Sequence, residues 1–259
     1  MIIKYIKIIF PTLLLLFFLI SCEEEIDVDF HPSDPRIVIE GQIQLDSLAT
    51  VRITESKSFG SDNVYNIIDN AVVMIDDDNG NCEVLTQNAF GLYVAHKTKG
   101  VVGRTYYLTV KVDEEIYNSE STLPTFVPIT TVSMYDMPIL GYPFPMVTFQ
   151  DPPIEENYYR CRYYVNGKRI MIDDNVIDTK DKNGFMVERT LPIYKNLNDD
   201  KDIVRGDLIR VELYSIDKNV YRYFEALNTT NNPASNIKGG ALGYFSAYAV
   251  DVCTVKADW

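Results

Sequence analysis

Apolar and polar residues alternate in short runs from Arg36 onward, and turn residues separate these runs. Alternation at every second position is typical of half-buried β-strands, so we expect a mainly β protein. The spacing of the runs predicts an immunoglobulin-like or transthyretin-like β-sandwich over residues 36–123. The strands expected in it are residues 36–43, 48–54, 71–75, 83–86, 91–94, 105–112 and 116–121.

A proline-containing stretch at residues 122–128 interrupts the alternation, and we expect a domain boundary there. The remaining chain, residues 124–259, is predicted to be a second β-rich domain. Residues 136–145 are rich in proline and glycine and residues 173–184 are hydrophilic, so both are expected to be loops. The strands expected here are residues 129–135, 147–149, 157–165, 169–172, 185–191, 208–216 and 242–255.

One short helix is predicted near residues 218–228 of the second domain. Its apolar residues recur at the three- and four-residue spacing of one helix face, and Asp217 precedes them as an N-cap. We expect this face to pack on the second sheet. The apolar residues are Val220, Tyr223, Phe224 and Leu227.

The N-terminus has the pattern of a secretory signal peptide. Lys4 and Lys7 precede an apolar run over residues 8–20, and Pro11 interrupts this run. A membrane-spanning helix needs about 20 apolar residues without an early break. Residues 1–21 are therefore expected to be a signal peptide.

The end of this leader, Leu-Ile-Ser-Cys at residues 19–22, resembles the lipobox of bacterial lipoproteins. The resemblance implies that the leader is cut before Cys22 and that Cys22 carries the lipid. Several acyl chains on one cysteine hold a protein firmly at a membrane, at about 0.8 kcal/mol per buried methylene. The alternative is an ordinary secreted protein in which the cysteine has no such role.

Three acidic residues, Glu23, Glu24 and Glu25, follow this cysteine directly. They resemble the acidic signal that sends lipoproteins of Bacteroidota to the outer face of the outer membrane. The alternative is a solvated spacer between lipid and protein. In both cases residues 22–35 are expected to form an extended acidic tether.

Charge disfavours one class of partner. The chain has 259 residues and a formal net charge of −13, without a cluster of basic residues. Nucleic-acid binding needs a basic face that displaces counterions, so no nucleic acid is expected as a partner.

Beyond Cys22 the cysteines are Cys82, Cys161 and Cys253, which leaves one disulfide or buried thiols as alternatives.

The acidic stretch at residues 76–81 admits a calcium site or a tight Asn-Gly turn. An EF-hand has glycine at the sixth loop position and glutamate at the twelfth. This chain has Asn81 and Gln87 at these positions. A turn needs no metal, and we expect the turn.

Catalytic chemistry has little support in the sequence. The only histidines are His31, in the tether, and His96, at an expected strand end. Paired acids at residues 155–156 and 173–174 could serve a glycosidase, yet adjacent acids in loops are usually solvated. The glycines at residues 239–243 lack the Lys-Ser/Thr of a P-loop and are expected to permit close backbone approach. We expect no enzyme, no metal and no cofactor.

Alternation over residues 157–165 separates two faces of one strand. If Tyr159, Cys161, Tyr163 and Val165 face the core, the other face is a stripe of tyrosine and arginine, as in many interfaces. The residues of this candidate interface are Tyr158, Arg160, Arg162 and Tyr164. The alternative is that the two arginines pair across strands with acids such as Glu212. The apolar loop at residues 138–145 is expected either to pack between the two domains or to be an exposed contact.

Three segments together carry a resemblance. Residues 29–41, 147–160 and 235–245 resemble, in this order, parts of an uncharacterised family of Bacteroidota outer-membrane lipoproteins. That family is a domain of unknown function often encoded beside TonB-dependent transporters. The resemblance implies a lipid-anchored cell-surface protein with a role accessory to nutrient uptake. Because the sequence also lacks a catalytic constellation, we expect a non-catalytic accessory or ligand-capturing module beside such a transporter. An adhesin or structural envelope protein without a small ligand is the alternative.

Overall fold

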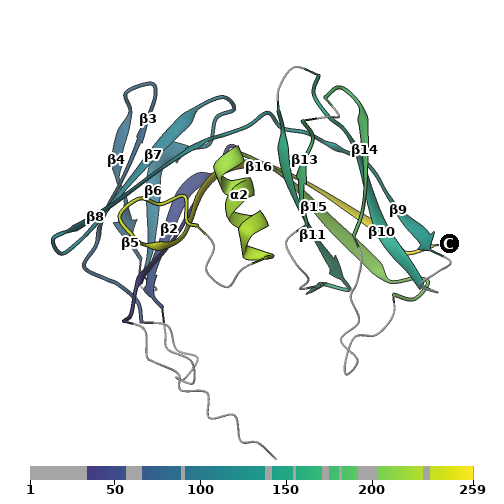
Figure 1. Cartoon of the computed structure of the whole chain (residues 1–259), viewed down its shortest axis with the longest axis horizontal. Helices are drawn as coiled ribbons and strands as arrows, with labels where there is room; N and C mark the ends of the chain where they lie inside the picture. Colours follow the sequence, from purple (N-terminus) through teal and green to yellow (C-terminus); the bar gives the residue numbers. More distant parts are fainter. Residues whose placement is uncertain are drawn as a thin grey trace, which may run out of the picture. The chain divides into compact units, whose positions relative to one another are not determined.

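The computed structural model describes residues 34–56, 66–88, 91–137, 142–153, 156–170, 175–180, 183–191, 203–229 and 234–258. From Pro35 on, these residues belong to one compact unit. They form β-strands in several sheets and one helix, so the mainly β fold predicted from alternation is confirmed (Figure 1). The signal peptide, the lipobox with Cys22 and the acidic residues Glu23, Glu24 and Glu25 lie outside the described residues.

The first half of the chain forms strands close to those expected. Strand β6 is longer than predicted and continues through His96 to Lys99, although burial no longer alternates there. The strands are β1 (Ile37–Gln44), β2 (Leu48–Glu55), β3 (Val72–Asp77), β4 (Cys82–Val84), β5 (Thr86–Gln87), β6 (Leu92–Lys99), β7 (Thr105–Val112) and β8 (Glu115–Thr122).

The second half adds further strands and the predicted helix, which begins and ends within one residue of its expected bounds. The elements are β9 (Ile129–Met137), β10 (Tyr142–Gln150), β11 (Tyr158–Val165), β12 (Lys168–Arg169), β13 (Asn175–Asp178), β14 (Met186–Thr190), β15 (Leu208–Ile216), α2 (Lys218–Leu227) and β16 (Leu242–Lys256).

Among the described residues, one long sheet connects both halves. Its strand order is β12-β11-β15-β16-β1-β2-β6-β5, with β13 paired to β11. Two smaller sheets have the orders β4-β3-β7-β8 and β14-β10-β9. Facing sheets with a shared apolar interior are the arrangement of a β-sandwich.

Two apolar cores lie between these sheets. The first core includes Ile39, Ile43, Val51, Ile53, Tyr93, Tyr106, Leu108 and Phe245. The second core includes Val147, Phe149, Tyr159, Cys161, Tyr163, Val187, Val211 and Leu213.

Strand β16 contributes to both cores with one face. Phe245 belongs to the first core and Cys253 packs against the second. The two residues are eight positions apart, so they lie on the same face of the strand. Leu242 pairs in parallel with Val38 of β1, whereas Lys256 pairs antiparallel with Leu208 of β15. The last strand therefore joins the first strand to the second half of the chain.

The domain boundary expected at residues 122–128 lies where the chain passes from one core to the other. Leu123 is buried in the first core and Val127 in the second. Residues 242–249 pair with β1 or pack in the first core although they follow this boundary. The division into domains stays a prediction.

Two expected loops contain strands instead. Strand β9 continues to Met137 and β10 begins at Tyr142, within the expected loop at residues 136–145. Proline normally weakens a strand because it lacks an N–H donor. The carbonyl of Pro145 accepts a hydrogen bond from the N–H of Leu191, so the backbone groups of Pro145 point away from β9. Pro143, two residues earlier, points the same way. The N–H groups that these prolines lack are therefore not needed for pairing with β9. Pro143 and Pro145 are buried.

The second expected loop, residues 173–184, contains β13, which pairs with β11. Strand β13 lies at the edge of the sheet and is only half-buried. Its residues therefore need not be apolar, and the hydrophilic sequence showed no sign of a strand. Conversely, the strand expected at residues 169–172 is reduced to β12, and residues 171–174 lie outside the described part.

A glycine makes the parallel pairing of β1 and β16 feasible. Gly243 lies opposite Ile39 and has a φ of +93°. A Cβ atom on Gly243 would lie 2.1 Å from the carbonyl oxygen of Ile39, far closer than van der Waals contact. Within the segment 239–243, the predicted close backbone approach is confirmed here.

None of the described helices has the length and apolar character needed to cross a membrane.

Candidate functional site

Alternation along β11 places four aromatic and basic side chains on the sheet face opposite the second core. Tyr159, Cys161 and Tyr163 are buried in that core, each 2% exposed or less. The intervening residues point to the other face. They are the four residues of the candidate interface, Tyr158, Arg160, Arg162 and Tyr164.

Helix α2 covers part of this face. Asp217 caps the helix by accepting hydrogen bonds from the backbone N–H groups of Asn219 at 2.8 Å and Val220 at 3.0 Å. Val220 and Phe224 are the helix residues that are buried, and they pack with Tyr158 and Ile216. The helix thus fixes the position of an aromatic ring above β11.

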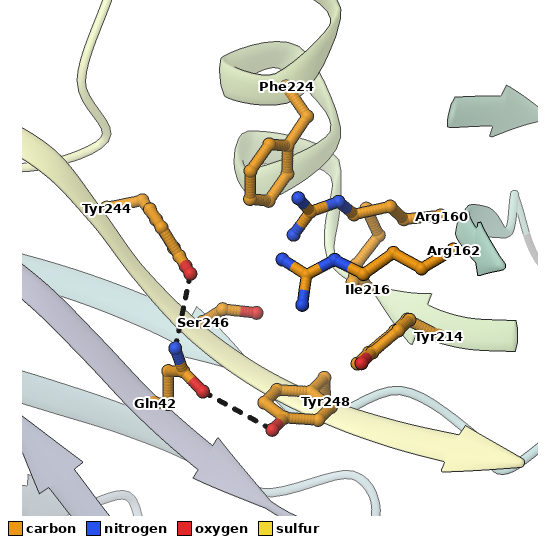
Figure 2. Close-up of a pocket in the computed structure, with 9 residues that line it drawn as sticks. All are labelled: Gln42, Arg160, Arg162, Tyr214, Ile216, Phe224, Tyr244, Ser246 and Tyr248. Carbon is orange, nitrogen blue, oxygen red and sulfur yellow. Dashed lines mark hydrogen bonds between the residues drawn. The ribbon is translucent and has the colours of Figure 1, made fainter. Parts of the chain in front are cut away.

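A cavity of about 30 Å³ lies between the helix and the sheet (Figure 2). One water molecule needs about 10–15 Å³ of such space, so the cavity has room for about two waters or for one small group of a ligand. We call it the arginine–tyrosine cavity. It is lined by Gln42, Arg160, Arg162, Tyr214, Ile216, Phe224, Tyr244, Ser246 and Tyr248.

The cavity has a buried floor and a rim that solvent reaches. Arg160, Phe224 and Ser246 are buried, whereas Arg162 and Tyr248 are half-buried. Of the predicted interface, Tyr158 and Arg160 are each only 6% exposed. The role of these four residues as an interface stays a prediction, and the accessible part of the stripe is Arg162 and Tyr164.

Both arginines point from β11 into the cavity with their guanidinium groups side by side (Figure 2). The Cζ atom of Arg160 lies 3.5 Å from the centroid of the Phe224 ring, and that of Arg162 lies 5.2 Å from the centroid of Tyr214. Aromatic faces attract guanidinium groups and restrict their orientation. Both cationic groups are therefore held in place.

A buried acid on the neighbouring strand β15 is engaged by several groups. Glu212 lies opposite Arg162 in the β11–β15 ladder and is 5% exposed. Its carboxylate accepts hydrogen bonds from the hydroxyls of Tyr164 at 3.2 Å and Tyr214 at 2.5 Å. It also forms an ion pair with Arg210. The register agrees with the alternative of cross-strand pairing between Arg162 and Glu212, but Glu212 does not line the cavity.

Two like charges in a small space repel each other. Alternate residues of a strand are about 7 Å apart, and at an effective dielectric constant of about 20 two unit charges at that distance repel by about 2 kcal/mol. Among the described residues that line the cavity, none is acidic. Arg160 and Arg162 thus place two positive charges at one cavity of an acidic protein of net charge −13.

The opposite wall supplies further donors. The side-chain amide of Gln42 donates to the hydroxyl of Tyr244 at 3.2 Å, and the hydroxyl of Tyr248 donates to Gln42 at 3.4 Å (Figure 2). Because its oxygen accepts from Gln42, Tyr244 keeps its O–H for another acceptor. Burial raises the pKa of Tyr244 and of Tyr248 more than Arg160 and Arg162 lower it, so both hydroxyls remain donors at neutral pH.

The described residues around the cavity carry cationic, amide and hydroxyl groups. The described lining residues include no carboxylate, imidazole or thiol, which are the usual general bases and nucleophiles. Cationic and hydroxyl donors around a small space suit the recognition of an acceptor-rich group.

The acidic stretch at residues 76–81 is a turn, as expected. Asp77 accepts hydrogen bonds from the backbone N–H groups of Asn79 at 3.0 Å and Asn81 at 2.9 Å. Arg104 forms an ion pair with Asp77 at 2.9 Å. These contacts occupy the Asp77 carboxylate and hold the turn. No group of three or more metal-ligating side chains occurs within the described ranges.

The other candidates remain apart from the cavity. His96 is exposed on β6, with Nε2 2.6 Å from the hydroxyl of Thr86. Glu156 pairs with Lys218 at 3.0 Å, while Glu155 and the acids at residues 173–174 lie outside the described residues, as does His31. The cysteines Cys82, Cys161 and Cys253 are free thiols.

Sequence reasoning identified the arginines of the cavity but missed its aromatic and amide partners. Alternation could have indicated part of this set. Tyr244 and Tyr248 are four residues apart and therefore share one face of β16, just as Arg160 and Arg162 share one face of β11. Tyr214 lies on the neighbouring strand β15. The order β11-β15-β16-β1 that brings these strands together cannot be read from alternation.

These features define a mainly β, sandwich-like protein with a small preformed polar cavity. The chain belongs to the family described as domain of unknown function (DUF4249), whose profile matches residues 23–253. No curated protein matches the chain. A solved structure described as a cytokine receptor complex, crystal form 1A, is similar over 85% of this chain and 96% of that chain, with 7% identity and a TM-score of 0.26. Similarity at this level carries no argument about function.

Proposed function

We propose that this protein is a non-catalytic lipoprotein of the outer membrane that faces the cell exterior and captures a ligand beside a TonB-dependent transporter. The observation that carries ligand capture is the arginine–tyrosine cavity, in which Arg160 and Arg162 face the hydroxyl of Tyr244 and the amide of Gln42. Binding sites are typically concave, largely preformed and supplied with few, well-placed polar groups.

The leader supports the proposed location. The apolar run at residues 8–20 ends at Cys22, which would carry the lipid, and Glu23, Glu24 and Glu25 would direct export to the outer face. A protein held only by lipid can lie beside a transporter while its folded part remains in water. The resemblance of residues 29–41, 147–160 and 235–245 to lipoproteins encoded beside such transporters supports the choice of partner.

Affinity isolation from detergent-solubilised outer membranes tests this proposal. The tagged, lipidated protein should retain a TonB-dependent transporter at a reproducible ratio. A Cys22→Ala variant serves as the control, because it should leave the membrane fraction and lose the transporter. Repeated isolation of the lipidated protein alone would contradict the proposal, and isolation with adhesin subunits would favour the adhesin alternative.

A further inference from the structure

We infer that the arginine–tyrosine cavity binds one carboxylate group of the ligand, with Arg160 and Arg162 as the cationic donors and Tyr244 as a neutral donor. This inference rests on the proposed function, because it names the chemical class of the ligand that the protein captures. The remainder of the ligand extends past the half-buried Arg162 toward solvent.

The donors match an oxyanion rather than a neutral polar group. Guanidinium groups carry only donors, and they form their strongest hydrogen bonds with carboxylate, phosphate or sulfate oxygens. Arg160 and Arg162 enter from one side of the cavity, and Tyr244 and Ser246 face them from β16 (Figure 2). An acceptor between them would be approached from both sides.

Charge leads to the same conclusion. Arg160 is only 6% exposed, so little water screens its attraction for an anion in the cavity. A bound anion would offset the repulsion between the two arginines.

Size distinguishes carboxylate from the larger oxyanions. A volume of about 30 Å³ accommodates about two waters, which matches the two oxygens of a carboxylate. Tetrahedral phosphate and sulfate carry four oxygens and need more room. The geometry therefore favours the terminal or side-chain carboxylate of a larger molecule.

The preformed site costs little to organise on binding. The Phe224 and Tyr214 rings hold the guanidinium groups at 3.5 Å and 5.2 Å from their centroids. The Gln42 amide fixes the hydroxyls of Tyr244 and Tyr248 by hydrogen bonds. Preorganisation of this kind increases affinity by reducing the entropy lost on binding.

The test measures anion binding by the lipidated, detergent-solubilised full chain. Acetate, inorganic phosphate and chloride are titrated at constant ionic strength and neutral pH, while thermal unfolding and the Arg Nε–Hε resonances are followed. Acetate should raise the melting temperature in a saturable way and shift the Arg162 resonance. Chloride should do neither.

Two variants give the residue assignment. Arg162→Gln should weaken acetate binding by about tenfold or more, since a charge-assisted hydrogen bond is lost. Arg205→Gln removes the same charge from an exposed ion pair with Asp258 and should leave acetate binding unchanged. Arg162 is chosen over Arg160 because its side chain is half-buried and the variant is expected to fold.

Equal effects of acetate and chloride, or an Arg162→Gln variant that binds acetate like the parent, would overturn the inference. Tighter binding of phosphate than of acetate would overturn the carboxylate assignment. Isolation with a transporter but without acetate binding contradicts this inference alone. Acetate binding without an associated transporter contradicts the proposed function alone.

Discussion

The guanidinium of Arg160 lies against the ring of Phe224, with the Cζ atom 3.5 Å from the ring centroid. Arg160 comes from β11 and Phe224 from α2, so this contact connects the helix to the floor of the arginine–tyrosine cavity. Phe224 is 4% exposed and also packs on Tyr244 at a centroid distance of 5.0 Å. One ring thus supports both the helix and the cavity.

Replacement of Phe224 by alanine should therefore destabilise the protein substantially. Truncation of a buried phenylalanine costs about 3–5 kcal/mol in free energy of unfolding. Leu227→Ala on the same helix is the control, because Leu227 is 43% exposed and exposed truncations usually change stability by about 0.5 kcal/mol. Urea unfolding of both variants measures the difference. Equal losses would show that Phe224 does not anchor the helix.

Gly243 and Gly240 provide a matched pair for the parallel β1–β16 contact. Both have positive φ, +93° and +89°, but an added Cβ meets the Ile39 carbonyl at 2.1 Å only at Gly243, and nothing within 4 Å at Gly240. Gly240→Ala should cost about 1–2 kcal/mol, the backbone penalty alone. Gly243→Ala should cost several kcal/mol more or prevent folding. Circular dichroism and urea unfolding distinguish these outcomes, and similar losses would argue against the close approach.

Acid should weaken the protein through Glu83. Burial alone would raise the pKa of Glu83, but hydrogen bonds from the Thr98 hydroxyl and from the N–H groups of His96, Thr98 and Lys97 outweigh it and lower the pKa from 4.5 to about 2. These N–H groups lie where β6 has extra residues opposite β2, since Leu48 pairs with Lys99 but Thr50 pairs with Val94.

A depressed carboxyl pKa stabilises the folded state above the unfolded value and loses this effect as protons bind. The contribution of Glu83 should be complete above pH 4.5 and should decline as the pH falls toward about 2. At neutral pH, Glu83→Gln should lose about 1–2 kcal/mol after allowance for solvent screening. The exposed Glu188→Gln is the control, and a pH-independent difference between parent and Glu83→Gln would contradict the assignment.

The free cysteines should differ strongly in reactivity. Burial raises the pKa of Cys161 more than Arg189 lowers it, from 9.0 to about 12, which reduces its thiolate about a thousandfold. Cys82 is exposed. Iodoacetamide should therefore label Cys82 in the native protein and Cys161 only after unfolding in urea, as peptide mass spectrometry can measure. Rapid native labelling of Cys161 would show that the second core opens readily.

If Cys22 carries the lipid as proposed, the acidic residues after it should determine which face of the membrane the protein occupies. Replacement of Glu23, Glu24 and Glu25 by glutamine should then retain membrane attachment through Cys22 but abolish exposure to the exterior. Protease treatment of intact cells measures exposure. If protease still digests the variant on intact cells, the three residues are a spacer.

Alternation predicted the β-rich fold because the burial of one strand face is a local property. The same rule placed Tyr159 and Cys161 in a core and Arg160 and Arg162 on the opposite face of β11. It failed where tertiary contacts override local preference, as in β10, where the direction of the backbone groups tolerates Pro143 and Pro145. Alternation also failed to predict the edge strand β13, because its residues are only half-buried and need not be apolar.

The cavity itself was beyond sequence reasoning. Its walls come from β1, β11, β15, α2 and β16, and Gln42 lies far along the chain from both Arg160 and Tyr244. No local pattern reports that β16 runs parallel to β1 or that α2 packs over β11. The helix could be predicted with its cap because Asp217 and the spacing of Val220 and Phe224 are local signals.

The parallel pairing of β1 with β16 has a consequence for the order of folding. Val38 near the start of the described chain pairs with Leu242 near its end, and contacts between distant residues form slowly because a large loop must close first. Until β16 arrives, β1 has one open edge and the first core lacks Phe245. The sheet that contains β1 can therefore be completed only after β16 has been synthesised. A chain truncated before Leu242 should lack the strand that pairs with both β1 and β15.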